Sequence, residues 1–418
     1  MSDLDPRGRH RVAITGIGVK TPAGTDVAAF WSRLSSGVSA GAVLRRYDPS
    51  GLSVRIGCEV PDFDTSAYVS TKEARRIDRA TLLGFAAATD ALADTGELGA
   101  DPARCAVVAG VGIGGLITLE EQVEVRLTKG PRGVSPLLVP MMMANATSAL
   151  VSLQFGWTGP NLTVATACAA STNAIGDAAE LIRHGTADVV MGLGAESCQT
   201  PTAIAAFARM TALSTRNDDP ARASRPFDAD RDGFVMGEGA AALVLERWDR
   251  AVARGAEIYA ELIGYGRNAD AYHITAPSPG GEGAAACMEL ALADADLDRS
   301  LVGHINAHGT STPLNDSAEA EAIRKVFGAS TPLVTSTKGV TGHMIGAAGA
   351  AEAAAAVLAI VHRQVPPTAN LERIGDDIQL DVVAGVPRPL APAPALSNSF
   401  GFGGHNATLI FAPAPGAE

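Results

Sequence analysis

The sequence predicts an α/β fold in which sheets are covered by helices. Short runs rich in β-branched residues alternate with alanine-rich runs along the chain, and this alternation is typical of layered α/β proteins. Of 418 residues, 47% are hydrophobic and only 19% are charged, while 45 are glycine. This composition favours closely packed layers over disorder. The second half repeats the alternation, so we expect two similar halves, 1–255 and 256–418.

Three short apolar runs in the first half predict buried strands, at 11–18, 105–110 and 188–193. Each has the length and the β-branched residues that are typical of a buried strand. Alanine-rich stretches at 82–92 and 171–182 predict helices, because alanine has the highest helix propensity. The resulting order is that of strands separated by covering helices.

The second half repeats this scheme after a join that we expect near 250–260. A glycine-dense turn at 401–404 precedes the last strand, and glycine permits positive φ angles and close approach of two backbones. The residues after that strand, 412–418, are expected to form a disordered tail. Strands are expected at 260–264, 304–307, 333–336 and 407–411, and helices at 283–295, 317–326 and 346–362.

Charge and hydropathy exclude two classes of partner. The formal net charge of −12 opposes attraction to nucleic acid phosphates, so we expect no nucleic acid binding. Residues 1–10 are polar and lack the apolar core of a signal peptide. The alanine-rich stretch 346–361 carries Glu352 in its middle, so we expect no membrane-spanning segment.

Cysteine usage points to a reducing compartment. The number of cysteines is odd, and no CxxC pair is present, so neither a disulfide framework nor a structural zinc site is indicated. We therefore expect a cytoplasmic protein. The cysteines are Cys58, Cys105, Cys168, Cys198 and Cys287.

Cys168 is the candidate nucleophile. It lies among small residues, between a strand-like run and the helix expected at 171–182. A helix N-terminus offers unpaired N–H groups and the positive end of the helix dipole, and both favour a thiolate. From this segment alone, a lone cysteine among alanines is better explained as a small core residue. The candidate partners of the thiol must decide between these interpretations.

Two histidines provide such partners, because both lie in glycine-rich turns. His308 precedes Gly309, and His343 follows Gly342. Side chains in such turns can converge on a pocket, and imidazole binds or moves protons near neutral pH. A structural role is the alternative for either ring alone. A metal pair of His304 with His308 is disfavoured, because the segment reads as a strand and no carboxylate ligand follows.

A lysine and a carboxylate accompany the two histidines in the sequence. Lys338 precedes the second histidine turn, and Glu319 lies in the helix expected after the first. The two side chains could pair and hold the histidines in position. The alternative is that both are solvated surface charges, as most charged residues are.

The turn at 110–115 reads GVGIGG and matches GxGxxG, which raises a dinucleotide-binding alternative. The match is poor, because it lies more than one hundred residues into the chain. No clear strand ending in an acidic residue follows about twenty residues later. We therefore interpret the segment as a turn that lines a substrate pocket.

An ordered set of motifs resembles the elongating β-ketoacyl-acyl carrier protein synthases of the type II class. The motifs are TACA at 166–169, SRPFD at 224–228, DGF at 232–234, DAYH at 270–273, HGTST at 308–312, KGVTGH at 338–343 and SFGFGG at 399–404. They cover nearly the whole chain, and as an ordered set they are highly specific. The resemblance implies a thiolase-like αβαβα fold of five layers, built from two similar halves.

The resemblance also implies a decarboxylative Claisen condensation. Cys168 would take an acyl chain as a thioester, with its own amide and that of Phe402 as oxyanion hole, a pair of donors suited to a tetrahedral oxyanion. His308 and His343 would bind the malonyl carbonyl and promote loss of carbon dioxide. Lys338 and Glu319 match the supporting pair.

Further positions match pocket and ligand residues of the family. Thr310 and Thr312 match hydroxyls that hold the phosphopantetheine arm, and Phe400 lies in the matching turn. Phe402 matches the gate of the acyl pocket, and Ile113 matches a residue of its wall. No tightly bound cofactor is implied, but a monovalent cation is held in some relatives by residues that match Asn306, Glu352, Ser397 and Asn398.

The implied partners are an acyl carrier protein and a second subunit. Lys72, Arg75 and Arg76 are spaced for one helical face and match a basic patch for the acidic carrier, although an ordinary solvated face is an equal alternative. Another carrier-contacting arginine of the family falls at Thr211 here, with Arg209 nearby. His405 also replaces a threonine found in many relatives.

Two rivals stay open beside a homodimeric condensing enzyme. One is the ketosynthase subunit of a polyketide synthase, which pairs with a cysteine-less chain length factor. The other, a non-catalytic acyl-binding protein, is disfavoured because Cys168, His308 and His343 are all present. The sequence leaves open the choice between fatty acid and polyketide synthesis, and the acyl chain length. Both the volume beneath Ile113 and the dimer-facing segment 141–145 affect that length.

Overall fold

Two sets of five strands repeat one arrangement in the computed structural model, which describes residues 3–329 and 331–414. The first set has the order β5 (Asn161–Val164), β4 (Cys105–Gly110), β6 (Val189–Glu196), β7 (Gly239–Arg247), β1 (Val12–Lys20). The second has the order β10 (Leu333–Thr335), β9 (His304–Asn306), β13 (Ala395–Gly401), β14 (His405–Pro413), β8 (Ala260–Ala269). The two sets meet where β1 pairs with β8, at Ala13–Glu261 and Ile14–Ala260.

Strand directions also repeat between the sets. In the first set β5, β4 and β6 are parallel, and β7 and β1 follow in antiparallel pairing. In the second set β10, β9 and β13 are parallel, and β14 and β8 follow in antiparallel pairing. Each strand of one five-strand set therefore has a counterpart in the other set.

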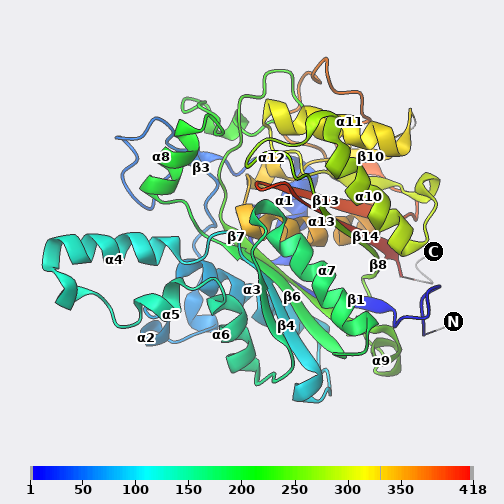
Figure 1. Ribbon diagram of the computed structural model, residues 1–418, viewed down its shortest axis with the longest axis horizontal. Helices are drawn as coiled ribbons and strands as arrows, with labels where there is room; N and C mark the ends of the chain where they lie inside the picture. Colours follow the sequence, from blue (N-terminus) through cyan, green and yellow to red (C-terminus); the bar gives the residue numbers. More distant parts are fainter. Residues whose placement is uncertain (1–2, 330, 415–418) are drawn as a thin grey trace.

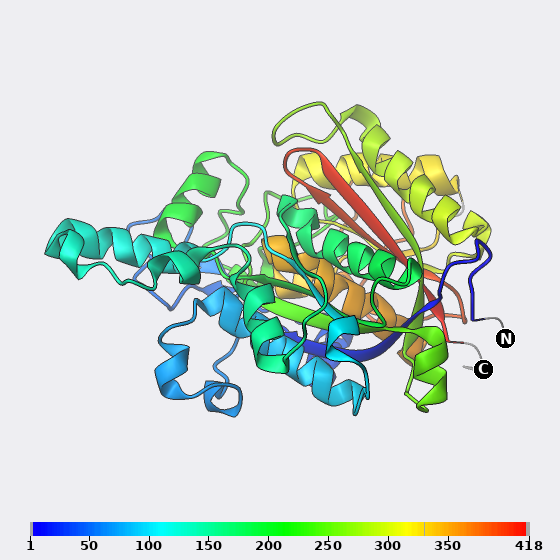
Figure 2. The same ribbon diagram turned by 60° about the horizontal axis from the view of Figure 1, so that its bottom comes forward.

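The strands and helices form five layers (Figures 1 and 2). The helix α3 (Arg79–Thr95) covers the outer face of the first sheet, whereas α10 (Glu282–Ala295) and α11 (Pro313–Phe327) cover the second. Between the sheets lie α7 (Ala170–Arg183) and α13 (Ala348–His362), each packed against strands of both halves. This αβαβα order is the one that the family resemblance implied.

The central helix α13 is buried because its surface is apolar all round. Alanines dominate it, and every residue from Ala348 to Ile360 is buried. The stretch Ile345–His362 is long and apolar enough to cross a membrane, but 89% of it is buried inside the fold. Glu352 lies in this core with a partner described below. The stretch is therefore the core helix of the layered structure.

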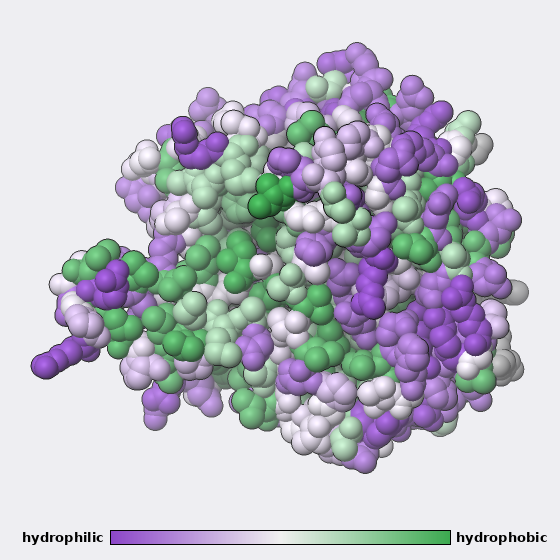
Figure 3. All heavy atoms as spheres, in the orientation of Figure 1, coloured by the Kyte–Doolittle hydropathy of each residue, from purple (hydrophilic) through white to green (hydrophobic). Residues whose placement is uncertain are grey.

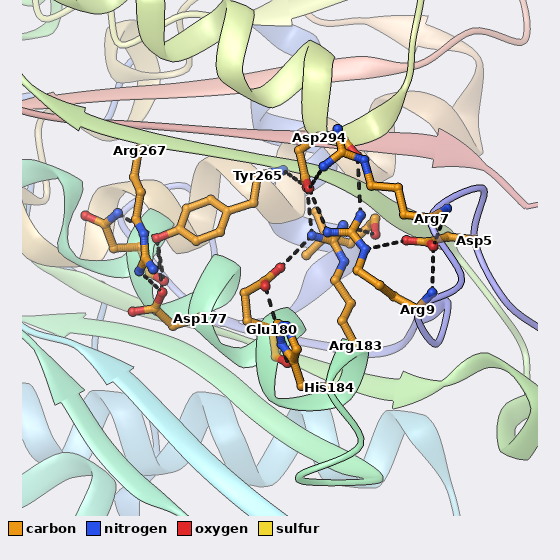
Figure 4. A network of polar contacts seen from close by, with 12 residues as sticks. Asp5, Arg7, Arg9, Asp177, Glu180, Arg183, His184, Tyr265, Arg267 and Asp294 are labelled. Atoms are coloured by element: carbon orange, nitrogen blue, oxygen red, sulfur yellow. Dashed lines mark hydrogen bonds and ion pairs between the residues drawn. The ribbon is translucent and has the colours of Figure 1, made fainter.

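A polar network ties the N-terminal segment to both halves (Figure 4). Arg183 of α7 and Arg9 each donate to the Asp294 carboxylate of α10, at 2.8 and 2.7 Å. Arg9 also pairs with Asp5. Asp177, which also lies in α7, accepts a hydrogen bond from the Tyr265 hydroxyl of β8 at 3.2 Å. These contacts hold α7, the helix behind Cys168, against the second half.

The predicted elements are present with shifted ends. The tail expected from residue 412 is partly wrong, because β14 continues to Pro413, which pairs with Ala260; residues 415–418 lie outside the described part. The strand β7, which lies between β1 and β6 in the sheet, was not predicted. Two short strand pairs lie outside the two sets, β2 (Ala42–Val43) with β3 (Ile56–Gly57) and β11 (Gln364–Val365) with β12 (Arg388–Pro389). The remaining α-helices are α1 (Val27–Ser36), α2 (Thr71–Ala74), α4 (Leu116–Lys129), α5 (Leu138–Met142), α6 (Ala146–Phe155), α8 (Pro201–Arg209), α9 (Trp248–Ala253) and α12 (Lys338–Thr341).

Candidate active site

The thiol and both imidazoles meet in the interior of the protein. Cys168 lies in the turn before α7, His308 follows β9, and His343 follows α12. One side-chain ligand atom from each of the three residues lies within 4.8 Å of the others, and the Cys168 Sγ is 3.0 Å from His343 Nε2. The two imidazole rings are nearly perpendicular, with centroids 5.3 Å apart. Residues more than one hundred positions apart thus share one site.

The backbone around Cys168 explains how the thiol reaches the site. Ala167 has a φ of 50°, a left-handed conformation that turns the chain sharply between β5 and α7. The Phe402 amide faces the thiol and donates to its sulfur. These two features present the side chain to residues of the opposite half.

Cys168 lies at the N-terminal end of α7, where the sequence predicted it, but burial opposes the thiolate form. The helix α7 begins at Ala170, after a short 3₁₀ turn that contains Cys168. Burial raises the pKa of Cys168 to about 11, although Lys338 and the Phe402 amide oppose this effect. Desolvation is the larger influence, so the thiol is neutral at neutral pH and lies beside a base.

Lys338 pairs with Glu352 and not with Glu319, which corrects the sequence prediction. The Lys338 ammonium forms a buried ion pair with Glu352 of α13, and its Nζ is 3.3 Å from His308 Nδ1. Glu319 of α11 instead accepts hydrogen bonds from the amides of His308 and Gly309, at 2.8 and 2.7 Å. Its two oxygens are thereby used to hold the histidine turn.

The environment fixes the protonation of both imidazoles. Burial lowers the pKa of His308 and of His343 well below the ordinary histidine value, and the charge of Lys338 lowers both further. Both rings are therefore neutral near pH 7. An ammonium group is a donor only, so His308 Nδ1 accepts from Lys338 and the ring proton lies on Nε2. His308 can donate that proton to a substrate oxygen.

A cavity of about 560 Å³ contains this cluster. The hydroxyls of Thr310 and Thr312, which are 2.9 Å apart, contact each other in its wall. Phe207, which was not predicted, also lines the cavity and packs against Phe402 with ring centroids 6.5 Å apart. A lone phenylalanine in a short helix carries no sequence signal for this role. The predicted residues that line the cavity are Ile113, Cys168, His308, Thr310, Thr312, Glu319, His343, Phe400 and Phe402.

The residues expected to hold a monovalent cation fit it in part. Among the described residues, Asn306 Oδ1, Glu352 Oε2 and Ser397 Oγ are buried oxygens without a hydrogen-bond partner. Oxygen ligands of this kind suit a hard cation. The Asn398 Oδ1 is already used, because it accepts from the Thr408 hydroxyl at 2.8 Å.

The basic residues lie on the surface, away from the buried cluster. Lys72, Arg75, Arg76 and Arg209 are all exposed. The first three do not share one helical face as expected, because α2 is a single turn that ends at Ala74, with Arg75 as its cap. Thr211, next to the cavity mouth, has a left-handed φ of 54°.

Comparison with known proteins gives one consistent result. Residues 9–251 match the family model described as "Beta-ketoacyl synthase, N-terminal domain", and residues 259–372 match its C-terminal domain. A relative from Synechocystis named 3-oxoacyl-(acyl-carrier-protein) synthase 2 is 48% identical over 96% of this chain and 98% of its own. A protein of the same name from Vibrio cholerae is 44% identical over 96% of this chain and 99% of its own.

Solved structures agree with this result. A β-ketoacyl synthase from Burkholderia phymatum superposes with a TM-score of 0.90 at 35% identity, over 97% of this chain and 99% of that one. The ishigamide ketosynthase/chain length factor gives 0.91 at 35% identity, over 97% and 100% of the two chains. These matches cover both halves of the fold. The chain belongs to the β-ketoacyl synthase family, whose members are acyltransferases that extend acyl chains by Claisen condensation.

Proposed function

We propose that the cluster of Cys168, His308 and His343 divides the condensation into two half-reactions. The observation that carries this proposal is the meeting of one neutral thiol and two neutral imidazoles in a single buried cavity. The substrates are an acyl chain and a malonyl group, each delivered on an acyl carrier protein. The product is a carrier-bound β-ketoacyl chain two carbons longer, in fatty acid or polyketide biosynthesis.

In the first half-reaction Cys168 takes the acyl chain. Its Sγ attacks the acyl thioester carbonyl, and the nearest base, His343 Nε2 at 3.0 Å, receives the thiol proton. The Phe402 amide, which faces Cys168, stabilises the tetrahedral oxyanion together with the amide of Cys168. The carrier's sulfur then leaves and takes the proton, so that a Cys168 thioester and a free carrier thiol remain.

In the second half-reaction the imidazoles act on the malonyl thioester. The Nε2–H of His308 donates to the thioester carbonyl, and His343 provides a second contact, so the enolate formed by loss of carbon dioxide is stabilised. The enolate carbon attacks the acyl carbonyl, a carbon–carbon bond forms, and the Cys168 sulfur leaves as a thiolate. One proton from solvent then restores the thiol, which balances the loss of the malonyl carboxylate as carbon dioxide. Lys338, held by Glu352, keeps the His308 ring oriented.

The carrier protein would dock at the cavity mouth and insert its phosphopantetheine arm. The paired hydroxyls of Thr310 and Thr312 in the cavity wall are suited to bind the polar arm. Lys72, Arg75, Arg76 and Arg209 are exposed cations that suit an acidic carrier surface. Among the solved structures, one similar chain is described as a type II polyketide acyl-carrier protein in complex with its ketosynthase.

A second subunit would cover the apolar arm formed by α4 and α5. Apolar side chains gather on this projecting arm (Figure 3), where Leu127 is 70% and Val139 is 61% exposed. Exposed apolar area of this kind marks protein interfaces. The nearby edge strand β5 is open to pairing at Leu162, which is 47% exposed. A homodimer and a heterodimer with a chain length factor use the same surface.

The unpartnered oxygens of Asn306, Glu352 and Ser397 would hold a structural monovalent cation. Such an ion would add a positive charge beside the Lys338–Glu352 pair and so help to fix α13. The free and buried state of all five cysteines supports a reducing compartment, the cytoplasm.

Intact mass measurement tests the proposed function. Incubation with acyl-carrier thioester should add one acyl mass to the native protein and none to Cys168→Gln. A non-catalytic acyl-binding protein would bind the chain without a covalent mass. Sizing of the purified protein alone, and then with co-expressed neighbouring gene products, distinguishes a homodimer from a heterodimer.

A further inference from the structure

The buried carboxylate of Glu196 lies behind the cavity wall, against the backbone of Gly112 and Ile113, and has no part in the mechanism above. It ends β6 and is fully buried. Its Oε2 accepts from the amides of Gly112 and Ile113 at 2.7 and 3.1 Å, and its Oε1 accepts from the Gly114 amide at 3.2 Å. The turn that resembles a dinucleotide motif therefore forms an anion-binding nest for an internal carboxylate.

The same carboxylate also contacts the other side of the cavity. Its Oε2 accepts from the Gly346 amide at 3.3 Å, and Gly346 lies in the 3₁₀ turn that precedes α13. The next residue back, Ile345, has a strained φ of 49° and lines the cavity. Glu196 thus bridges the turn of Ile113 and the segment that follows His343.

The backbone around Glu196 is packed so closely that a side chain at Gly112 or Gly346 would clash. A Cβ added to Gly112 would lie 2.5 Å from Glu196 Oε2, and one added to Gly346 would lie 2.1 Å from the Gly112 amide nitrogen. Two backbone segments from opposite halves are therefore in direct contact around the carboxylate. Ile113, which follows Gly112, has its position in the cavity wall determined by this contact.

We infer that Glu196 is a positioning residue that sets the acyl chain length accepted by the cavity, because it fixes Ile113 in the wall. This inference rests on the proposed acylation of Cys168. Release of the 112–114 turn would let Ile113 move and would deepen the cavity for longer chains. The carboxylate touches no reacting atom and acts through the turn alone.

Glu196→Gln is the test variant, because its amide NH₂ would face backbone N–H groups that need acceptors. Acylation of Cys168 is measured by intact mass with a panel of short and long acyl-carrier thioesters. We expect the ratio of long-chain to short-chain acylation rates to rise about tenfold, the size of discrimination that a pocket wall provides. If Glu196→Gln does not fold, Glu196→Asp, which withdraws the oxygens by one methylene, carries the same measurement.

Two further variants separate positioning from general destabilisation. Glu246 is equally buried but lies at the opposite end of the sheet, where it pairs with Arg254. Glu246→Gln should therefore lower stability and leave the chain-length ratio unchanged. In an Ile113→Ala background, addition of Glu196→Gln should change the ratio by less than about twofold, because the side chain through which it acts is gone.

The outcomes distinguish this inference from the proposed function. Lack of acylation of the native protein by every thioester would overturn the proposed function. A folded Glu196 variant that acylates with the native length ratio would overturn the inference alone. So would a variant whose malonyl decarboxylation changes while its length ratio does not, since Glu196 would then act on His343.

Discussion

The N-termini of α7 and α13 occupy equivalent places in the two halves but differ in what they contact. Each helix connects the outermost parallel strand of its sheet to the central one, and each follows a 3₁₀ turn whose first residue has a left-handed φ, 50° at Ala167 and 49° at Ile345. At α7 the turn presents the Cys168 thiol to the cavity. At α13 it presents the Gly346 amide to the Glu196 carboxylate.

The end of each central strand faces the helix of the other half. The segment after β13 places the Phe402 amide against Cys168, whereas β6 ends with Glu196 against Gly346. A duplicated fold thus offers two polar sites, and one is filled by an internal carboxylate. Only the site that stays open to the cavity is left for a substrate. The duplicated fold therefore places two equivalent polar sites, and the residues at each site decide whether it carries out the reaction or stabilises the structure.

The largest effect is expected from removal of the Cys168 thiol at the N-terminal end of α7. Cys168→Gln should lower acylation by at least about a thousandfold, because no other side chain replaces the nucleophile. Malonyl decarboxylation should persist, since His308 and His343 stay in place. Intact mass and carbon dioxide release measure the two activities. Loss of decarboxylation in a protein with unchanged thermal unfolding would contradict the division of labour between thiol and imidazoles.

Removal of the His308 imidazole, which is held by Lys338, should have the complementary effect. His308→Ala should slow condensation by about 10²- to 10⁴-fold, the usual contribution of a positioned proton donor. Acylation should stay near the native rate, because His343 is the ring in contact with Cys168. Transfer of a labelled acyl group from the carrier measures acylation, and a failure to acylate would count against this assignment.

The N-terminal end of α13, where Glu196 contacts Gly346, should not tolerate an added side-chain atom. Gly346→Ala should lower the free energy of unfolding by about 3 kcal/mol, because its Cβ would meet the Gly112 nitrogen at 2.1 Å. Gly51→Ala is the matched control, since nothing lies within 4 Å of a Cβ at that position. The control should change stability by less than about 0.5 kcal/mol. Urea denaturation compares the two, and equal values would show that the α13 end is not tightly packed.

The smallest effect concerns the titration of Glu196. Burial raises its pKa to about 7, although the surrounding amides oppose the shift. Between its unfolded value of 4.5 and about 7 the folded state holds a proton that the unfolded state has lost, so this contribution to stability falls as pH rises. From pH 5 to 7, native stability relative to Glu196→Gln should fall by about 2 kcal/mol, as measured by urea denaturation. The opposite slope would mean that the amides outweigh burial.

Local pattern predicted many of the buried strands and helices, although not β7, and it identified the reactive groups. The buried strands at 105–110 and 188–193 and the helix at 171–182 were predicted, because apolar periodicity and alanine content depend only on neighbours in the sequence. The thiol and the histidines were found for a related reason. Reactive side chains in glycine-rich turns are visible in the sequence itself, and the order of the motifs indicated the family.

Tertiary structure alone decided which groups are partners and which forms they take. Lys338 pairs with Glu352 and not with Glu319, because α13 brings Glu352 to the ammonium while backbone amides occupy Glu319. The expected thiolate is a neutral thiol, because burial outweighs the nearby positive charge. The turn at 110–115, which resembles a dinucleotide motif in sequence, binds the side chain of Glu196 in the folded protein. Desolvation and hydrogen-bond partners depend on segments that meet only in space, so sequence determined which groups are present, and packing determined what each one does.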